Sequence, residues 1–178
     1  RKIRRERRNK KIVIAQLAPR ILPHLPERVR RYTEDNLKKL SIDLHFETTV
    51  EKAHGQYVEL TDGSVFESAS LVWSPGVAAP DIANTTGLET GAQQRVYVNP
   101  YLQATSDCFV AGDSALLLKN NTPLRLSVQF ALQEGKCAAQ NIVRREKRKP
   151  LKVCKPLDLG YVIPMANSRS VGKALGIP

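Results

Sequence analysis

Hydrophobic positions in the first third of the chain follow two different periods. A short apolar run at residues 11–14 (KIVI) has the length and composition of a buried parallel strand. After a proline-rich loop, Pro26 predicts the start of a helix over 27–40, because proline at the first helical position sacrifices no hydrogen bond. Over residues 42–60 the period becomes two, with turn dipeptides such as His54-Gly55 between the runs. This alternation predicts an antiparallel meander of about three strands that begins at residue 42.

The second half of the chain is expected to contain short strands and one long helix. Apolar runs at residues 71–73 and 108–111 predict two buried strands, and residues 96–98 predict a shorter one. A helix is expected over 126–147 and a last strand over 161–163. The residues expected on the inner side of that helix are apolar or small: Val128, Ala131, Leu132, Gly135, Ala138, Ala139 and Ile142.

Positive charge is concentrated in two segments of the chain. The net charge is +11, yet residues 1–11 hold eight basic residues and one acid, and residues 144–155 hold seven and one. For 1–11 we favour a solvated helix end, whereas for 144–155 a solvated end and a membrane-facing patch both stay open. Nucleic acid is not an expected partner, because few aromatic residues interleave with the charge and no zinc-finger spacing is present.

Several classes of protein and site are disfavoured by what the sequence lacks. The three cysteines form no CxxC pair and no metal-ligand pattern with the histidines, which predicts reduced thiols in a cytosolic setting and no metal site. No run of about 18 apolar residues and no signal peptide occurs. No side-chain arrangement for nucleophilic or acid–base catalysis stands out, so we expect a cofactor to supply the chemistry.

The segment 105–113 (TSDCFVAGD) is the best candidate for a binding site. An apolar strand that ends in Gly112 and Asp113 presents a carboxylate at the carboxyl edge of a parallel sheet, where such folds bind ligands. Gly112 allows a ligand to approach the backbone closely, and Asp113 accepts hydrogen bonds from a polyol. In isolation the tripeptide Ala111-Gly112-Asp113 is more often a plain turn between a strand and a loop, so its interpretation depends on its neighbours.

Those neighbours form an ordered set of motifs. In chain order they are PRILP at 19–23, an amphipathic helix, a meander with a DG turn, LVWSPGV at 71–77, RVYVN at 95–99, FVAGD within 105–113, and a glutamine pair followed by Asn-Ile in the long helix. Together they resemble the flavoproteins with two dinucleotide-binding domains, and most closely the type II NADH dehydrogenases, which are single-subunit NADH:quinone oxidoreductases. The resemblance covers nearly all 178 residues.

The resemblance implies an α/β chain with a partial three-layer FAD/NAD(P)-binding fold and an antiparallel β-meander, truncated at both ends. Residues 1–73 would be the second half of the NAD(P)H-binding domain, and 74–155 the C-terminal part of the FAD-binding domain. Residues 156–178 would begin a C-terminal region. The family needs two G-x-G-x-x-G fingerprints, and the sequence, which starts without Met, contains neither. We therefore expect the isolated chain to be inactive and to bind FAD weakly or not at all.

The resemblance also implies roles for residues of the second half. Asp113 matches the acid that binds the ribityl chain of FAD, and Gly112 permits the close approach. Gln129 and Gln133 match the glutamines of the family's A-Q-x-x-Q signature, which lies near the flavin and the quinone. Val128 stands where the family usually has alanine.

The remaining implied roles concern the nucleotides. Gln16 stands where the family often has an acid that holds the adenosine ribose, so the choice between NADH and NADPH stays open. Gly76 and Val77 belong to a crossover segment that passes close to both nucleotides, whereas Trp73 is expected in the core. The whole enzyme would pass hydride from NAD(P)H to FAD and on to a membrane quinone. It would lie on the cytoplasmic face of the cell membrane as a peripheral protein, with a homodimer possible.

Two alternatives remain. A sulfide:quinone oxidoreductase needs a redox pair of cysteines, and Cys137 and Cys154 are not expected to lie together, since one is in the middle of a helix and the other follows a proline. A basic module that binds lipid or nucleic acid without catalysis would explain the charged segments. It would leave residues 105–113 and the glutamine pair unexplained.

Overall fold

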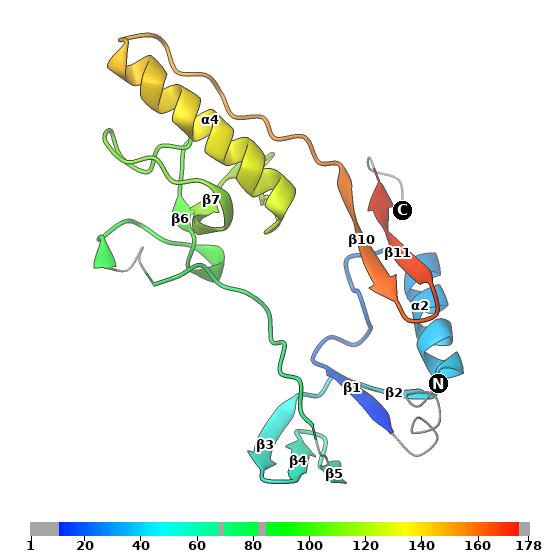
Figure 1. Ribbon diagram of the computed structural model, residues 1–178. Coiled ribbons are helices and arrows are strands. Elements are labelled where there is room, and N and C mark those ends of the chain that lie inside the picture. Colours follow the sequence, from blue (N-terminus) through cyan, green and yellow to red (C-terminus); the bar gives the residue numbers. More distant parts are fainter. Residues whose placement is uncertain (1–10, 68–69, 82–84, 175–178) are drawn as a thin grey trace, which may run out of the picture. The chain divides into compact units, whose positions relative to one another are not determined.

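The computed structural model describes residues 11–67, 70–81 and 85–174, which form two compact units (Figure 1). Unit 1 comprises the described residues of 1–73 and 160–178, and unit 2 comprises those of 74–159. Of the basic segment 1–11, only Lys11 lies within the described residues. The chain thus leaves unit 1, builds unit 2 and returns to unit 1.

Unit 1 begins with a β–α–β arrangement. Strand β1 (Ile12–Gln16) pairs in parallel with β2 (Ile42–Phe46), and helix α2 (Glu27–Lys39) connects them. The helix starts where proline predicts it, since the carbonyl of Pro26 accepts the N–H groups of Val29 and Arg30. The predictions of this strand and this helix are confirmed.

A three-stranded antiparallel meander follows, but it does not contain β2. Its strands are β3 (Val50–His54), β4 (Tyr57–Leu60) and β5 (Val65–Glu67), with β4 in the centre. The expectation that the meander begins at residue 42 is wrong, because β2 pairs with β1 instead. A period of two identifies a half-buried strand in either kind of sheet, so it does not reveal the pairing partner.

A C-terminal hairpin completes unit 1. Strands β10 (Gly160–Met165) and β11 (Arg169–Ala174) pair antiparallel, and β10 extends the strand expected at 161–163. The buried side chain of Asn36 in α2 holds this hairpin. Its amide donates to Met165 Sδ over 3.7 Å, and its oxygen accepts from Asn167 and Arg169 over 3.3 and 3.4 Å.

Residues 71–73 do not form the expected buried strand. Leu71, Val72 and Trp73 have no regular secondary structure and are 47%, 88% and 58% exposed. The placement of Trp73 in a core is therefore wrong as well. An apolar composition favours burial, but a strand also needs a neighbour for its backbone hydrogen bonds, and composition does not supply one.

Unit 2 is built from short strands beside one long helix. Strand β6 (Val96–Tyr97) pairs in parallel with β7 (Ala115–Leu116), and β8 (Leu118–Lys119) forms a hairpin with β9 (Thr122–Pro123). Helix α4 (Val128–Glu146) lies beside β6 and β7 in Figure 1. A core cluster of four buried residues lies within the unit: Leu102, Leu117, Ala138 and Cys154.

Two expectations for unit 2 need correction. Residues 108–111 form only an isolated bridge between Phe109 and Gln103, so no buried strand leads into Gly112. The buried side chains of α4 are Phe130, Glu134, Ala138 and Asn141, whereas five of the residues expected inside are exposed: Val128, Leu132, Gly135, Ala139 and Ile142. The hydrophobic pattern failed there because Glu134 and Asn141 are buried and hydrogen-bonded, which a count of apolar positions ignores.

Candidate flavin-binding site

The predicted site residues Gly112 and Asp113 lie in a tight turn between residue 111 and β7. The turn, Gly112–Ser114, is one turn of 3₁₀-helix. Gly112 has a φ of +69°, and a Cβ atom there would lie 3.1 Å from the Cβ of Ala131 in α4. Both the left-handed backbone and the close contact favour glycine. The exposed Asp113 follows immediately, so the helix and the turn fix its backbone at the surface of unit 2.

Glu134 is a buried acid beside this turn that the sequence patterns did not identify. Its carboxylate accepts a 2.8 Å hydrogen bond from the N–H of Gly112, and its side chain is 1% exposed. Burial raises the pKa of Glu134, while the Gly112 hydrogen bond and the positive charge of Arg95 act in the opposite direction. The only available signal was its position one residue after Gln133.

Arg95 is the buried cation of the same region and was also missed as a site residue. It is 2% exposed, and its guanidinium donates to the carbonyl oxygen of Ala115 from Nε over 2.9 Å and to that of Leu124 over 2.8 Å. Desolvation lowers the pKa of Arg95, and the negative charges of Glu134 and Asp113 oppose this shift. Arg95 was visible only as a member of the RVYVN motif.

The predicted quinone-site glutamines bind the backbone of an extended segment. Gln133 donates to the carbonyl of Leu157 over 3.0 Å and accepts the N–H of Leu157 over 2.8 Å. Gln129 accepts the N–H of Leu159 over 2.8 Å. One helix face therefore carries both amides, and they hold residues 157–159 along α4.

The remaining predicted site residues fall in different units. Gln16 is half-buried at the end of β1 in unit 1, where its carbonyl oxygen accepts the N–H of Thr48. Gly76 and Val77 lie in unit 2, in a segment without regular secondary structure. Gly76 has a φ of +123°, which glycine adopts readily, and Val77 is 67% exposed.

Comparison with known proteins identifies the family. Residues 5–136 match the family described as pyridine nucleotide-disulphide oxidoreductase. The chain belongs to this family. A type II NADH:quinone oxidoreductase of Haemophilus influenzae is 30% identical over 165 residues, which cover 90% of this chain and 37% of that protein. A relative of the same name in Staphylococcus aureus is 24% identical, covering 94% of this chain and 43% of the relative. The chain thus spans less than half the length of these curated relatives.

Solved structures of two reductases share the fold. A ferredoxin reductase from Rhodopseudomonas palustris has a TM-score of 0.69 at 24% identity, over 85% of this chain and 38% of that chain. An NAD-dependent persulfide reductase from A. fulgidus has a TM-score of 0.72 at 18% identity, over 88% of this chain and 30% of that chain. The predicted α/β dinucleotide-binding fold is confirmed, and at these identities the likeness concerns the fold alone.

Two cysteines of unit 2 lie together, contrary to expectation. Cys137 packs against the core cluster that contains Cys154, and the neighbouring Cys137 thiol contributes to raising the pKa of Cys154. The expected separation is wrong because the chain doubles back along α4 after residue 150. Burial is the largest cause that raises the pKa of Cys154, so the reactive thiolate is disfavoured. The pair therefore fits a packed core better than a redox centre.

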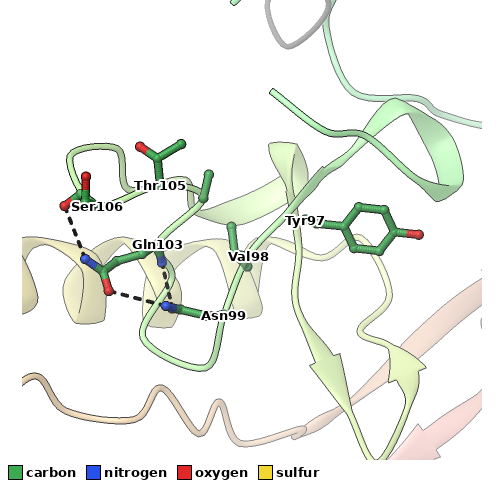
Figure 2. Close-up of a pocket in the computed structure, with 7 residues that line it drawn as sticks. Tyr97, Val98, Asn99, Gln103, Thr105 and Ser106 are labelled. Carbon is green, nitrogen blue, oxygen red and sulfur yellow. Dashed lines mark hydrogen bonds between the residues drawn. The ribbon is translucent and has the colours of Figure 1, made fainter. Parts of the chain in front are cut away.

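A separate polar cavity of about 330 Å³ lies next to β6 (Figure 2). Its lining includes Asn99, Gln103 and the start of the segment 105–113, but neither Gly112 nor Asp113. The side-chain oxygen of Asn99 accepts the N–H of Gln103 over 3.0 Å, and the Gln103 amide donates to the carbonyl of Ser106 over 3.4 Å. These polar groups bind one another, so this cavity is a weaker candidate than the turn Gly112–Ser114, which we call the Asp113 turn. Among the described residues, no cluster of His, Cys, Asp or Glu could hold a metal ion.

Proposed function

We propose that this chain is part of an FAD-dependent enzyme that passes hydride from NAD(P)H to the flavin and then reduces a membrane quinone. The observation that carries the proposal is the Gly112–Ser114 turn, which puts an exposed carboxylate beside a glycine pressed against α4. Asp113 would bind the ribityl hydroxyls of FAD, and Gly112 would leave room for them. The bound FAD would supply the redox chemistry. The names of the curated relatives support quinone as the acceptor.

The other predicted residues would position the substrates. Gln16, at the end of a parallel strand, would contact the adenosine ribose of NAD(P)H, and Gly76 and Val77 would pass close to both nucleotides. Gln129 and Gln133 would lie at the quinone end of the flavin. Since their amides hold residues 157–159, we propose that they shape the quinone site partly through that segment.

Exchange of Asp113 tests the flavin assignment. In the product of the complete reading frame that encodes this chain, Asp113→Ala is expected to lower FAD content and NADH:quinone reductase activity together, by at least about tenfold. Asp35→Ala, which removes an exposed acid of α2, is the control and should change neither. Full flavin content in the Asp113→Ala protein would contradict the assignment. Activity lost by Cys137→Ala with flavin retained would favour sulfide chemistry instead.

We also propose that the enzyme binds the cytoplasmic face of the membrane as a peripheral protein. No helix in the described part of the chain is long and apolar enough to cross a bilayer. A largely apolar cavity of about 460 Å³ near the end of α4 is bordered by cations, which suits acyl chains beneath anionic headgroups. Its lining residues are Lys136, Ala139, Gln140, Val143, Arg144 and Lys152. Whether the enzyme is a homodimer stays a prediction without structural support.

Vesicle binding tests the membrane proposal. Exchange of both Lys136 and Lys152 for glutamine is expected to weaken binding to phosphatidylserine vesicles about tenfold, with little effect on phosphatidylcholine vesicles. Exchange of both Lys38 and Lys39 for glutamine, at exposed positions of α2, is the charge-matched control. Tighter binding to duplex DNA than to anionic vesicles at the same salt concentration would instead favour a nucleic-acid partner.

A further inference from the structure

We propose that Glu134 and Arg95 are a pair of positioning residues that hold the Asp113 turn from both of its ends. The identity of the bound polyol as the ribityl chain of FAD rests on the function proposed above. We call Glu134 and Arg95 together the clamp, and the clamp itself rests on contacts within unit 2. Neither residue touches the ligand in this proposal, so both act through the backbone of the turn.

Glu134 holds the start of the turn. Its carboxylate Oε2 accepts the Gly112 N–H over 2.8 Å, in the peptide unit that leads into Asp113. The Ala131 side chain, one helical turn earlier in α4, limits the approach of Gly112 from the same side. A buried carboxylate that accepts a backbone N–H forms one of the stronger hydrogen bonds in proteins. Gly112 is thus fixed both by contact and by a directional bond.

Arg95 holds the end of the turn. Two of its nitrogens, Nε and Nη2, donate to the carbonyl oxygen of Ala115, two residues after Asp113. Its third donor reaches the carbonyl of Leu124, which ties the turn to the segment before α4. Asp113 therefore lies between two backbone groups that are each bound by a buried charged side chain.

A purely stabilising role explains this arrangement poorly. A buried acid and a buried base cost desolvation energy, and well-packed apolar residues are often as stabilising. Apolar side chains, however, offer neither an acceptor for the Gly112 N–H nor donors for the Ala115 carbonyl. The two charges also favour each other's ionised form, so each supports the other's hydrogen bonds. The arrangement fits a requirement for one fixed position of the carboxylate that follows Gly112.

Two readouts test the clamp. In the 178-residue chain, Glu134→Ala is expected to speed hydrogen exchange of the Gly112 amide about tenfold, whereas Glu134→Gln, which keeps an acceptor oxygen, restores most of the protection. In the product of the complete reading frame, Glu134→Ala and Arg95→Lys should each weaken FAD binding about tenfold, with rescue by Glu134→Gln. The matched control is Glu146→Ala, an exposed acid at the end of the same helix.

The outcomes separate the clamp from the flavin assignment. Unchanged Gly112 exchange in Glu134→Ala overturns the clamp. The clamp is also overturned if Asp113→Ala abolishes FAD binding while Glu134→Ala and Arg95→Lys both leave FAD affinity unchanged. If Glu134→Ala does not fold, equal FAD affinity of Arg95→Lys and wild type overturns it. Asp113→Ala should abolish FAD binding with Gly112 exchange unchanged. If Asp113→Ala keeps its FAD while Gly112 exchange still responds to Glu134, the flavin assignment fails and the clamp stands.

Discussion

Protonation of the buried Glu134 should be visible in the stability of this protein. Burial raises its pKa above the ordinary value of 4.5. The unfolded chain therefore loses this proton at a lower pH than the folded chain does. The stability that Glu134 contributes is complete below about pH 4.5 and declines as the pH rises through its higher folded-state pKa.

Glu134→Gln should remove this decline, because glutamine does not titrate. We expect the free energy of unfolding of the variant, relative to wild type, to increase between pH 4.5 and neutral pH. Urea denaturation of both proteins across this range measures the difference. A difference that stays constant with pH would show that Glu134 has the same pKa in the folded and unfolded states. Glu146→Gln, at an exposed position of the same helix, controls for loss of one carboxylate.

At the scale of elements, side-chain amides of α4 hydrogen-bond the backbone of the chain that follows the helix. Asn141 is fully buried and exchanges two hydrogen bonds with the backbone of Lys152, with a third bond to the carbonyl of Tyr101. Gln133 and Gln129 continue the same contacts further along. Side chains of a helix thus replace the neighbouring strand that an extended segment would otherwise need.

Loss of the two glutamine amides should release the far end of this segment. In the Gln129→Ala and Gln133→Ala double variant, the amides of Leu159 and Leu157 are expected to exchange about tenfold faster, because each loses its acceptor. Hydrogen exchange followed by NMR measures this at single residues. Gln140→Ala removes an exposed glutamine of the same helix and should leave both amides unchanged. Equal exchange in all three proteins would show that other contacts hold the segment.

At the scale of the whole molecule, the chain returns to unit 1 after it has formed unit 2. The hairpin β10–β11 follows unit 2 in sequence but packs in unit 1. In α2, the side chain of Asn36 is 2% exposed and forms hydrogen bonds with three side chains of the hairpin segment. They belong to Met165, Asn167 and Arg169. Cation–π contact between Arg169 and Tyr32, at 6.0 Å, adds to the docking. The integrity of unit 1 therefore depends on residues more than a hundred positions apart.

Asn36→Leu should loosen the hairpin without affecting unit 2. Leucine makes none of the three hydrogen bonds of Asn36 with the hairpin, so we expect unit 1 to lose about 1 kcal/mol of stability. Amides of β10 and β11 should exchange faster, while those of α4 keep their protection. Asp35→Leu changes the exposed neighbour and is the control. Faster exchange in α4 to the same extent would show that the two units unfold as one.

The sequence by itself determined the local features of this protein. The helices α2 and α4 lie within two residues of their expected limits, and the order of motifs identified the dinucleotide-binding family. These features depend on periodicity and on proline and glycine, which act over a few residues. The Gly112–Asp113 turn was also found from its local pattern, although the strand expected before it is absent.

Only the tertiary structure decided which residues meet. It paired β2 with β1 instead of with the meander, put Glu134 and Asn141 inside, and brought Cys137 next to Cys154. A period of two in the hydrophobic pattern does not reveal which strand pairs with it. A polar side chain is stably buried when it finds hydrogen-bond partners, and for these residues the partners are backbone groups distant in the sequence. The clamp around Asp113 could not be predicted for the same reason. Arg95 and Glu134 acquire their roles only when the fold brings the two ends of one turn within reach of both.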